Sequence, residues 1–186
     1  LREGPELADL RAAVTDWYPG CRIVVLSHLN QGALLSAFAG AAAVTALHDP
    51  LIIDLADIVY DCETDMPDLF AQAPDLGAIV PTFGADDPCY SYLRLGPDGS
   101  VIEAAEKRVI SNHASAGTYI FRSLGDFLSA AGNCLTVAPD ELTVRGALFV
   151  CPVVNGLIRQ GKRVMPLPVQ NVRPISKLLH GSASAA

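Results

Sequence analysis

Residues 31–54 read QGALLSAFAGAAAVTALHDPLIID, and this stretch decides the fold class. Its first part, residues 31–47, is rich in Ala and Leu and predicts a helix, which the HDP sequence at 48–50 ends. Residues 51–54 then predict a short strand that is apolar on both faces, as in a parallel sheet covered on both sides. A helix that leads into such a strand is typical of strand–helix–strand units and therefore of an α/β protein.

The alternation of helices and strands continues on both sides of this stretch. Upstream, the pattern predicts a helix over 5–16 and a strand over 22–26. Downstream, it predicts strands over 77–83, 90–95, 101–106, 117–122 and 163–169, and helices over 65–73, 123–131 and 148–160. The turn sequence GPDG at 96–99 joins two of these strands as a β-hairpin, which is an antiparallel insert. We therefore expect an α/β fold with a mixed sheet.

The length and composition of the chain fit one domain. The 186 residues, 51% of them hydrophobic, can bury enough apolar surface to fold, and we place the domain at residues 1–180. The tail over 181–186, GSASAA, has no side chain that could anchor it, so we expect it to be flexible. No run approaches the roughly 18 apolar residues of a membrane span, and no secretory signal is visible. We expect a soluble protein with no membrane partner.

Charge and cysteine usage exclude several classes. The formal net charge is -7 and Lys plus Arg number 13, so an extended phosphate backbone meets a repulsive field and nucleic acid is not the expected partner. A small phosphorylated ligand is compatible, because a few cations and a divalent metal can reverse the local field. The five cysteines are odd in number and lack a CxxC pair, which disfavours disulfides and zinc. We predict reduced, mostly buried thiols and a cytoplasmic location: Cys21, Cys62, Cys89, Cys134 and Cys151.

Three aspartates, Asp54, Asp57 and Asp61, follow the apolar residues 51–53 of the predicted strand. In a wound α/β sheet the carboxyl ends of the strands form the ligand crevice. Mg²⁺ is commonly held there by one or two carboxylates together with substrate phosphates. We therefore take Asp57 as the candidate metal ligand and Mg²⁺ as the expected cofactor. The alternative is a solvated turn with ordinary acidic residues at a helix start.

Two further sites have residues suited to a phosphorylated sugar. Glu106 can accept hydrogen bonds from sugar hydroxyls, and the adjacent Lys107 can bind phosphate, although the pair could equally be a surface charge cluster. Gly117 begins a predicted strand, where a small residue lets a ligand approach the backbone or simply packs closely. The chain contains no GxGxxG, GxxxxGK[ST] or GxSxG motif, and its four histidines lack metal-ligand spacing.

Five short motifs occur in a fixed order along the chain. They are NQGA at 30–33 opening the Ala-rich helix, PLII at 50–53 leading to Asp57, the hairpin over 91–107 ending in Glu-Lys, the strand over 116–121, and FVCPVVN at 149–155 followed by Gly161-Lys162. In this order they resemble the sugar-phosphate nucleotidyltransferases, especially those of capsule and lipopolysaccharide gene clusters. That resemblance implies a three-layer Rossmann-like fold of the GT-A type and covers roughly residues 20–170.

The resemblance also implies roles for individual residues. Asp57 would bind Mg²⁺, Gly32 would lie near the nucleotide base, and Glu106, Lys107 and Gly117 would face the sugar or alcohol phosphate. The implied reaction, with Asp57 and Lys107 as its catalytic residues, transfers a nucleoside monophosphate from an NTP to a sugar-1-phosphate or a related phosphomonoester. A nucleotide or nucleotide-sugar is therefore the expected ligand.

The chain departs from the family pattern at several places. The first strand–helix–strand unit, with its Gly-rich triphosphate loop, has no counterpart in the sequence, so we expect an N-terminally truncated fold, possessing a sheet edge that another chain, a helix or a second copy covers. Pro152 stands where a second metal-binding aspartate is expected, and Arg108 follows the Glu-Lys pair where Pro is expected. Activity is therefore left open. The alternatives are a non-catalytic sugar-nucleotide-binding or subunit-interface protein, and a fragment of a longer enzyme.

Overall fold

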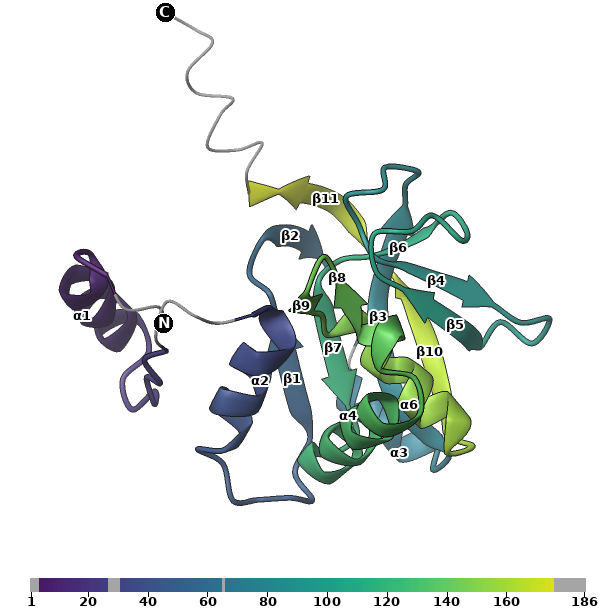
Figure 1. The fold of residues 1–186 in the computed structure, drawn as a ribbon, viewed down its shortest axis with the longest axis horizontal. Helices are drawn as coiled ribbons and strands as arrows, with labels where there is room; N and C mark the ends of the chain where they lie inside the picture. Colours follow the sequence, from purple (N-terminus) through teal and green to yellow (C-terminus); the bar gives the residue numbers. More distant parts are fainter. Residues whose placement is uncertain (1–3, 27–30, 65, 176–186) are drawn as a thin grey trace, which may run out of the picture.

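A seven-stranded mixed sheet forms the centre of the computed structural model, which describes residues 4–26, 31–64 and 66–175 (Figure 1). The strand order is β1-β7-β3-β6-β4-β5, and β10 pairs with β3. The strands are β1 (Leu51–Asp54), β3 (Leu76–Gly84), β4 (Tyr92–Leu95), β5 (Val101–Ala105), β6 (His113–Ser115), β7 (Thr118–Phe121) and β10 (Arg163–Pro168). This arrangement confirms the predicted α/β class and the predicted hairpin.

Helices cover both faces of the sheet and complete three layers. Figure 1 places α4 and α6 over one face and α3 on the other, whereas α1 lies apart from the body. The helices are α1 (Leu7–Trp17), α2 (Ala33–Ala41), α3 (Met66–Gln72), α4 (Leu124–Val137), α5 (Pro139–Leu142), the 3₁₀ turn η1 (Cys151–Val153) and α6 (Val154–Arg159). Two small sheets pair β2 (Ile58–Asp61) with β11 (Gln170–Pro174), and β8 (Thr143–Val144) with β9 (Ala147–Leu148).

The two cores follow from the alternation of side chains along buried strands. On β7, Tyr119 and Phe121 enter the larger core beneath α2, α4 and α6, whereas Ile120 enters the smaller core beneath α3. Helices α4 and α6 approach closely at Gly156, where an added Cβ would lie 2.2 Å from the carbonyl oxygen of Ala130. Only glycine fits at that contact.

The predicted parallel pairing of β1 is wrong. β1 is antiparallel to β7, and among the described strands of this sheet only β3 and β10 are parallel. The short turn between β4 and β5 imposes antiparallel pairing on those two strands, whereas β1 and β7 are far apart in the chain, so no short connection fixes the direction of β1. Leu51 and Ile53 pack against the core, but Ile52 is 62% exposed, so β1 is covered on one face only. β1 also ends the strand order, and pairs with no further described strand at its outer edge.

Several predicted element bounds are also corrected. Residues 22–26 form no strand, and only Leu26 takes part in an isolated bridge, because a strand requires a neighbour for its hydrogen bonds. The helix predicted over 31–47 ends at Ala41, before the β-branched Val44 and Thr45. The helix predicted over 148–160 is replaced by β9, η1 and the shorter α6. The helix capped by Ser123 is confirmed and extends to Val137. The tail over 181–186 lies outside the described residues.

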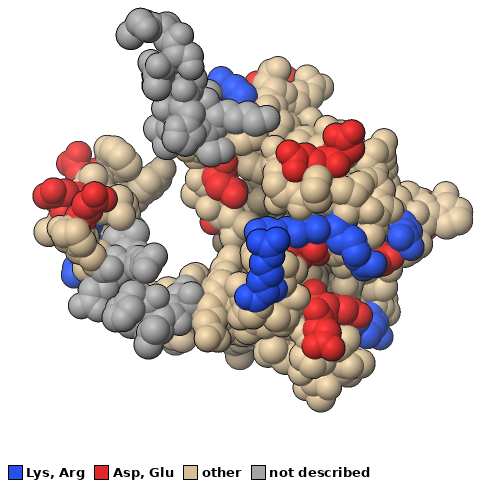
Figure 2. Space-filling view, turned by 45° about the horizontal axis from the view of Figure 1, so that its top comes forward, with Lys and Arg blue, Asp and Glu red and all other residues tan. Residues whose placement is uncertain are grey.

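The surface corrects the prediction of mostly buried thiols. Cys21, Cys62 and Cys89 are exposed, Cys134 and Cys151 are buried, and all five are free, as predicted. Figure 2 shows that Lys and Arg side chains on the face it presents lie beside groups of Asp and Glu. Within the described residues, no helix combines the length and the apolar character needed to cross a membrane.

Candidate functional site

A cavity of about 360 Å³ opens where β1 ends, β7 begins and β5 ends. Four of the residues predicted from the sequence line it: Asp57, Glu106, Lys107 and Gly117. Hydroxyl and aromatic side chains that the sequence did not single out complete the lining, among them Tyr90, Ser91, Ser115, Tyr119 and Phe149. The fold therefore brings together residues that are far apart in the sequence, such as Asp57 and Phe149, which are separated by 92 positions.

Asp57 and Gly117 lie side by side for a different reason from the one that the sequence suggested, which was a row of parallel strand ends. The register of β1 and β7 places Asp54 opposite Thr118, so the end of one strand lies beside the start of the other. The Leu55 amide donates to the Gly117 carbonyl oxygen at 3.0 Å, which continues the pairing past the strand ends. Antiparallel pairing, not a row of parallel strand ends, forms this edge of the cavity.

The loop that carries Asp57 is held by its neighbour Asp54. Asp54 Oδ1 accepts from the Ala56 amide at 2.6 Å, and Asp54 Oδ2 accepts from Thr118 Oγ1 at 3.0 Å. Thr118 Oγ1 in turn accepts from the Tyr60 hydroxyl at 2.9 Å. These bonds hold Ala56 at a φ of +57°, a left-handed conformation that costs a non-glycine residue free energy. Asp54 is thus a structural residue that orients the loop.

Gly117 leaves room for the Asp57 carboxylate. Its φ is +80°, and an added Cβ would lie 3.0 Å from Asp57 Oδ1. Both the backbone conformation and the close contact favour glycine. The Asp57 backbone is held as well, because the Ile175 amide donates to its carbonyl oxygen at 2.8 Å.

Glu106 is half-buried at the opposite wall of the cavity. Its burial raises the pKa of the carboxyl, and the negative charge of Asp57 acts in the same direction. A hydrogen bond from Ser91 Oγ to Glu106 Oε2, at 2.5 Å, and the positive charge of Lys107 lower the pKa but do not cancel the effect of burial. Held in this way, the carboxyl group can accept hydrogen bonds from ligand hydroxyls.

Lys107 provides the positive charge at the cavity. Its backbone adopts a φ of +50°, and its Nζ lies 5.1 Å from the centre of the Phe149 ring. The contact with the ring face steadies an exposed cation. Phe149 stands in the motif over 149–155 but carried no signal of its own as a site residue.

A buried polar layer closes the floor of the cavity. Ser115 Oγ donates to the Tyr119 hydroxyl at 3.1 Å, and Cys151 lies beside them. Burial raises the pKa of Cys151 to about 12 and that of Tyr119 well above its ordinary value. Both side chains therefore remain uncharged at neutral pH.

Gly32 does not line the cavity, but its neighbour Ala33 does. Gly32 precedes α2 at a φ of +114°, and an added Cβ would lie 2.2 Å from the carbonyl oxygen of Leu148. It therefore lets the start of α2 meet β9 at the rim of the cavity. Asp61 lies elsewhere, where it accepts from Asn171 Nδ2 at 2.7 Å.

The carboxylates at the cavity suit a magnesium ion that is bound partly by the protein and partly by a phosphorylated ligand. They do not suit an ion that is bound by protein side chains alone. Among the described residues, no three His, Cys, Asp or Glu side chains gather as metal ligands. Asp57 and Glu106 are the two carboxylates that line the cavity. Mg²⁺ is usually bound by one or two carboxylates plus phosphate oxygens and waters, so these residues fit an ion held jointly with a phosphorylated ligand.

The fold is shared with solved pyrophosphorylases. A nucleoside-diphosphate-sugar pyrophosphorylase from Vibrio cholerae matches with a TM-score of 0.75 at 21% identity, covering 92% of this chain and 72% of that chain. A candidate glucose-1-phosphate thymidylyltransferase from Bacillus anthracis, in complex with sucrose, gives 0.67 at 17% identity, covering 99% and 74%. A UDP-glucose pyrophosphorylase complexed with UDP-glucose gives 0.61 at 14% identity, covering 90% and 66%. No protein-family model and no curated protein sequence matches the chain. At such identities the likeness shows the fold.

Proposed function

We propose that this chain is a nucleotidyltransferase-like protein that binds a nucleotide-sugar, or the sugar phosphate from which it is made, together with Mg²⁺. One observation carries the proposal: Asp57, Glu106, Lys107 and Gly117 converge on one cavity of a fold shared with solved nucleotide-sugar pyrophosphorylases. A cation beside a carboxylate that can receive hydroxyls is the arrangement that a phosphorylated sugar requires.

Each residue has a role in this proposal. Lys107 binds the phosphate, Glu106 receives sugar hydroxyls, and Gly117 admits the ligand close to the backbone. Asp57 holds Mg²⁺, which when bound neutralises phosphate charge. Gly32 shapes the rim near Ala33, where the nucleotide base would lie.

The proposed reaction is an in-line displacement at phosphorus. A phosphate oxygen of the sugar-1-phosphate forms a bond to the α-phosphorus of an NTP, the bond from that phosphorus to the bridging oxygen breaks, and pyrophosphate leaves with the electron pair. Lys107 and Asp57 serve it by positioning and charge, with no covalent intermediate on the protein. We propose cytoplasmic synthesis of nucleotide-sugars for polysaccharide as the setting.

A non-catalytic binding protein is the second candidate. The observation that favours it is Pro152, which stands where the family resemblance implies a second metal-binding aspartate. The outer edge of β1, which pairs with no other strand among the described residues, bears on the same question, since a partner chain or a second copy would cover it. The transferase and the binding protein would bind the same ligand, but only the transferase would convert it to product.

Calorimetry with UDP-glucose and glucose-1-phosphate, with and without Mg²⁺, tests the proposal. We expect Mg²⁺-dependent binding that Asp57→Asn abolishes. Asp61→Asn is the matched control, because this aspartate lies outside the cavity and is expected to leave binding unchanged. Absence of binding by the wild-type protein would refute the proposal, and pyrophosphate release on adding an NTP would decide between transferase and binding protein.

A further inference from the structure

We propose that Asn155 is a positioning residue that holds the end of β5, and with it Glu106 and Lys107, in the geometry that the ligand requires. This inference rests on the proposed function. Asn155 lies in α6, outside the ligand cavity, and touches the site through the backbone of β5.

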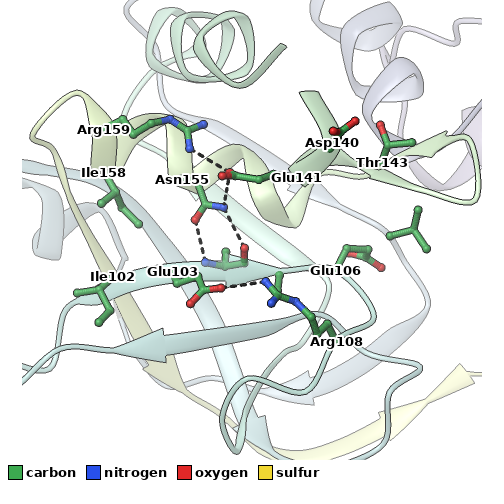
Figure 3. A pocket seen from close by; sticks show the side chains of 13 residues that line it. Ile102, Glu103, Glu106, Arg108, Asp140, Glu141, Thr143, Asn155, Ile158 and Arg159 are labelled. Carbon is green, nitrogen blue, oxygen red and sulfur yellow. Dashed lines mark hydrogen bonds and ion pairs between the residues drawn. The ribbon is translucent and has the colours of Figure 1, made fainter. Parts of the chain in front are cut away.

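Asn155 sits behind β5 in a second cavity of about 550 Å³ (Figure 3). The residue is buried, with an exposed fraction of 8%. Asn155 Oδ1 accepts from the Ala104 amide at 2.8 Å, and Asn155 Nδ2 donates to the Ala104 carbonyl oxygen at 2.9 Å. One side-chain amide thus satisfies both backbone groups of a buried strand residue.

The amide of Asn155 takes the place of a neighbouring strand. β5 ends the strand order of the sheet, and pairs with β4 on its other side, where Ala104 lies opposite Leu93. In an antiparallel ladder the two backbone groups of a residue point to the same side. Those of Ala104 point away from β4 and would be buried without a partner if Asn155 did not reach them.

The two hydrogen bonds between Asn155 and Ala104, called the clamp below, lie close to the ligand-binding residues. Ala104 precedes Glu106 by two residues and Lys107 by three, and Glu106 lines both cavities. Glu106, just beyond the end of β5, therefore lies at the wall between the two cavities. Ser91 holds Glu106 from the side of the ligand cavity, and Asn155 holds the strand from behind.

The orientation of the amide is fixed by its surroundings. Glu141 Oε2 accepts from Asn155 Nδ2 at 3.0 Å and from Arg159 Nη1 at 3.0 Å, so the NH₂ end must face Glu141. Arg159 is held in turn by Asn133 Oδ1, at 2.8 Å. The titratable and charged groups around this clamp are Asp140 and Glu141 of α5, Glu103 of β5 with Glu106 and Arg108 beyond it, Arg159 of α6 and Cys134 of α4.

The test compares Asn155→Asp with the control Asn133→Ala, which loses a bond to Arg159 but no contact with β5. Asn155→Asp keeps the acceptor for the Ala104 amide but removes the donor to the Ala104 carbonyl oxygen and to Glu141. We expect about tenfold weaker binding of UDP-glucose with Mg²⁺ at about pH 8, comparable to losing one hydrogen bond to a charged group. Asn133→Ala should bind like the wild type.

The pH profile distinguishes positioning from general destabilisation. The introduced carboxyl lies beside Glu141, and two adjacent carboxyls raise the pKa of one of them. Once protonated, the new group has one O–H, which can restore one of the two bonds that the amide donated, so the ratio of variant to wild-type affinity should recover in part as the pH falls. Hydrogen exchange should show the Ala104 amide less protected in the variant at about pH 8.

Three results would overturn the inference: equal binding by Asn155→Asp and the wild type, an equal defect in Asn133→Ala, or a defect that does not change with pH. If Asn155→Asp does not fold, Glu141→Ala carries the test, because it removes the group that orients the amide and leaves the bonds to Ala104. We expect it to weaken binding two- to fivefold, and unchanged binding would refute the inference. A wild-type protein that binds no ligand would refute the proposed function itself.

Discussion

Replacing Gly117 by Ala perturbs the candidate site at one contact. The new Cβ would lie 3.0 Å from Asp57 Oδ1 and 3.7 Å from Leu55 Cβ. The first distance is shorter than an ordinary van der Waals contact, so the carboxylate must move by a few tenths of an ångström. Gly117 also has a φ of +80°, which alanine adopts only at a cost.

Gly99→Ala separates the two effects. Gly99 has nearly the same φ, +78°, but an added Cβ would meet nothing within 4 Å. We expect Gly99→Ala to lower the free energy of unfolding by about 1 kcal/mol, the cost of a left-handed alanine. Gly117→Ala should lower it by about 2 kcal/mol, because crowding against Asp57 adds to that cost. For a chain of this size the two costs correspond to melting temperatures lower by about 3 and about 6 °C.

Urea unfolding and calorimetry check this expectation together. Gly117→Ala should lose Mg²⁺-dependent binding of UDP-glucose while still unfolding cooperatively, and Gly99→Ala should keep it. Equal losses of stability in the two variants would show that the contact with Asp57 costs nothing. Unchanged binding by Gly117→Ala would show that the position of the carboxylate is unimportant.

Three further results are expected. Gly156→Ala, which forces a Cβ against the Ala130 carbonyl oxygen, should lower the free energy of unfolding by about 3 kcal/mol in thermal unfolding. Gly132→Ala, in open space within α4, should instead raise it by about 0.5 to 1 kcal/mol, because alanine favours the helix over glycine. Because burial raises the pKa of Glu106, the folded protein keeps that proton at a pH where the unfolded chain has lost it; the contribution of Glu106 to stability therefore falls as the pH rises above about 4.3. Glu106→Gln should remove that contribution when unfolding is followed from about pH 4 to about pH 7, and the same dependence of stability on pH in the variant and the wild type would contradict the assignment. A thiol reagent should modify the three exposed cysteines in the folded protein and the two buried ones only after denaturation.

Local sequence signals sufficed for several elements. The apolar run over 77–83 became β3, and the alternating segments around the GPDG turn became the hairpin of β4 and β5. Ser123 caps α4 by accepting from the Asp126 amide at 3.0 Å. Each of these features depends on residues close to one another in the chain, so propensity, periodicity and turn chemistry reveal them.

The sequence alone also singled out Asp57, Glu106, Lys107 and Gly117, because each of them lies near the end or at the start of a predicted strand. It could not show that they share a cavity, since that depends on the antiparallel pairing of β1 with β7.

The tertiary structure alone decided the direction of β1, the pairing of β2 with β11 and the contact between Asn155 and Ala104, which are 51 residues apart. The reason is physical: a strand's direction and a buried amide's partner depend on which distant backbone groups remain to be satisfied once the cores have formed. Local preference does not encode that choice.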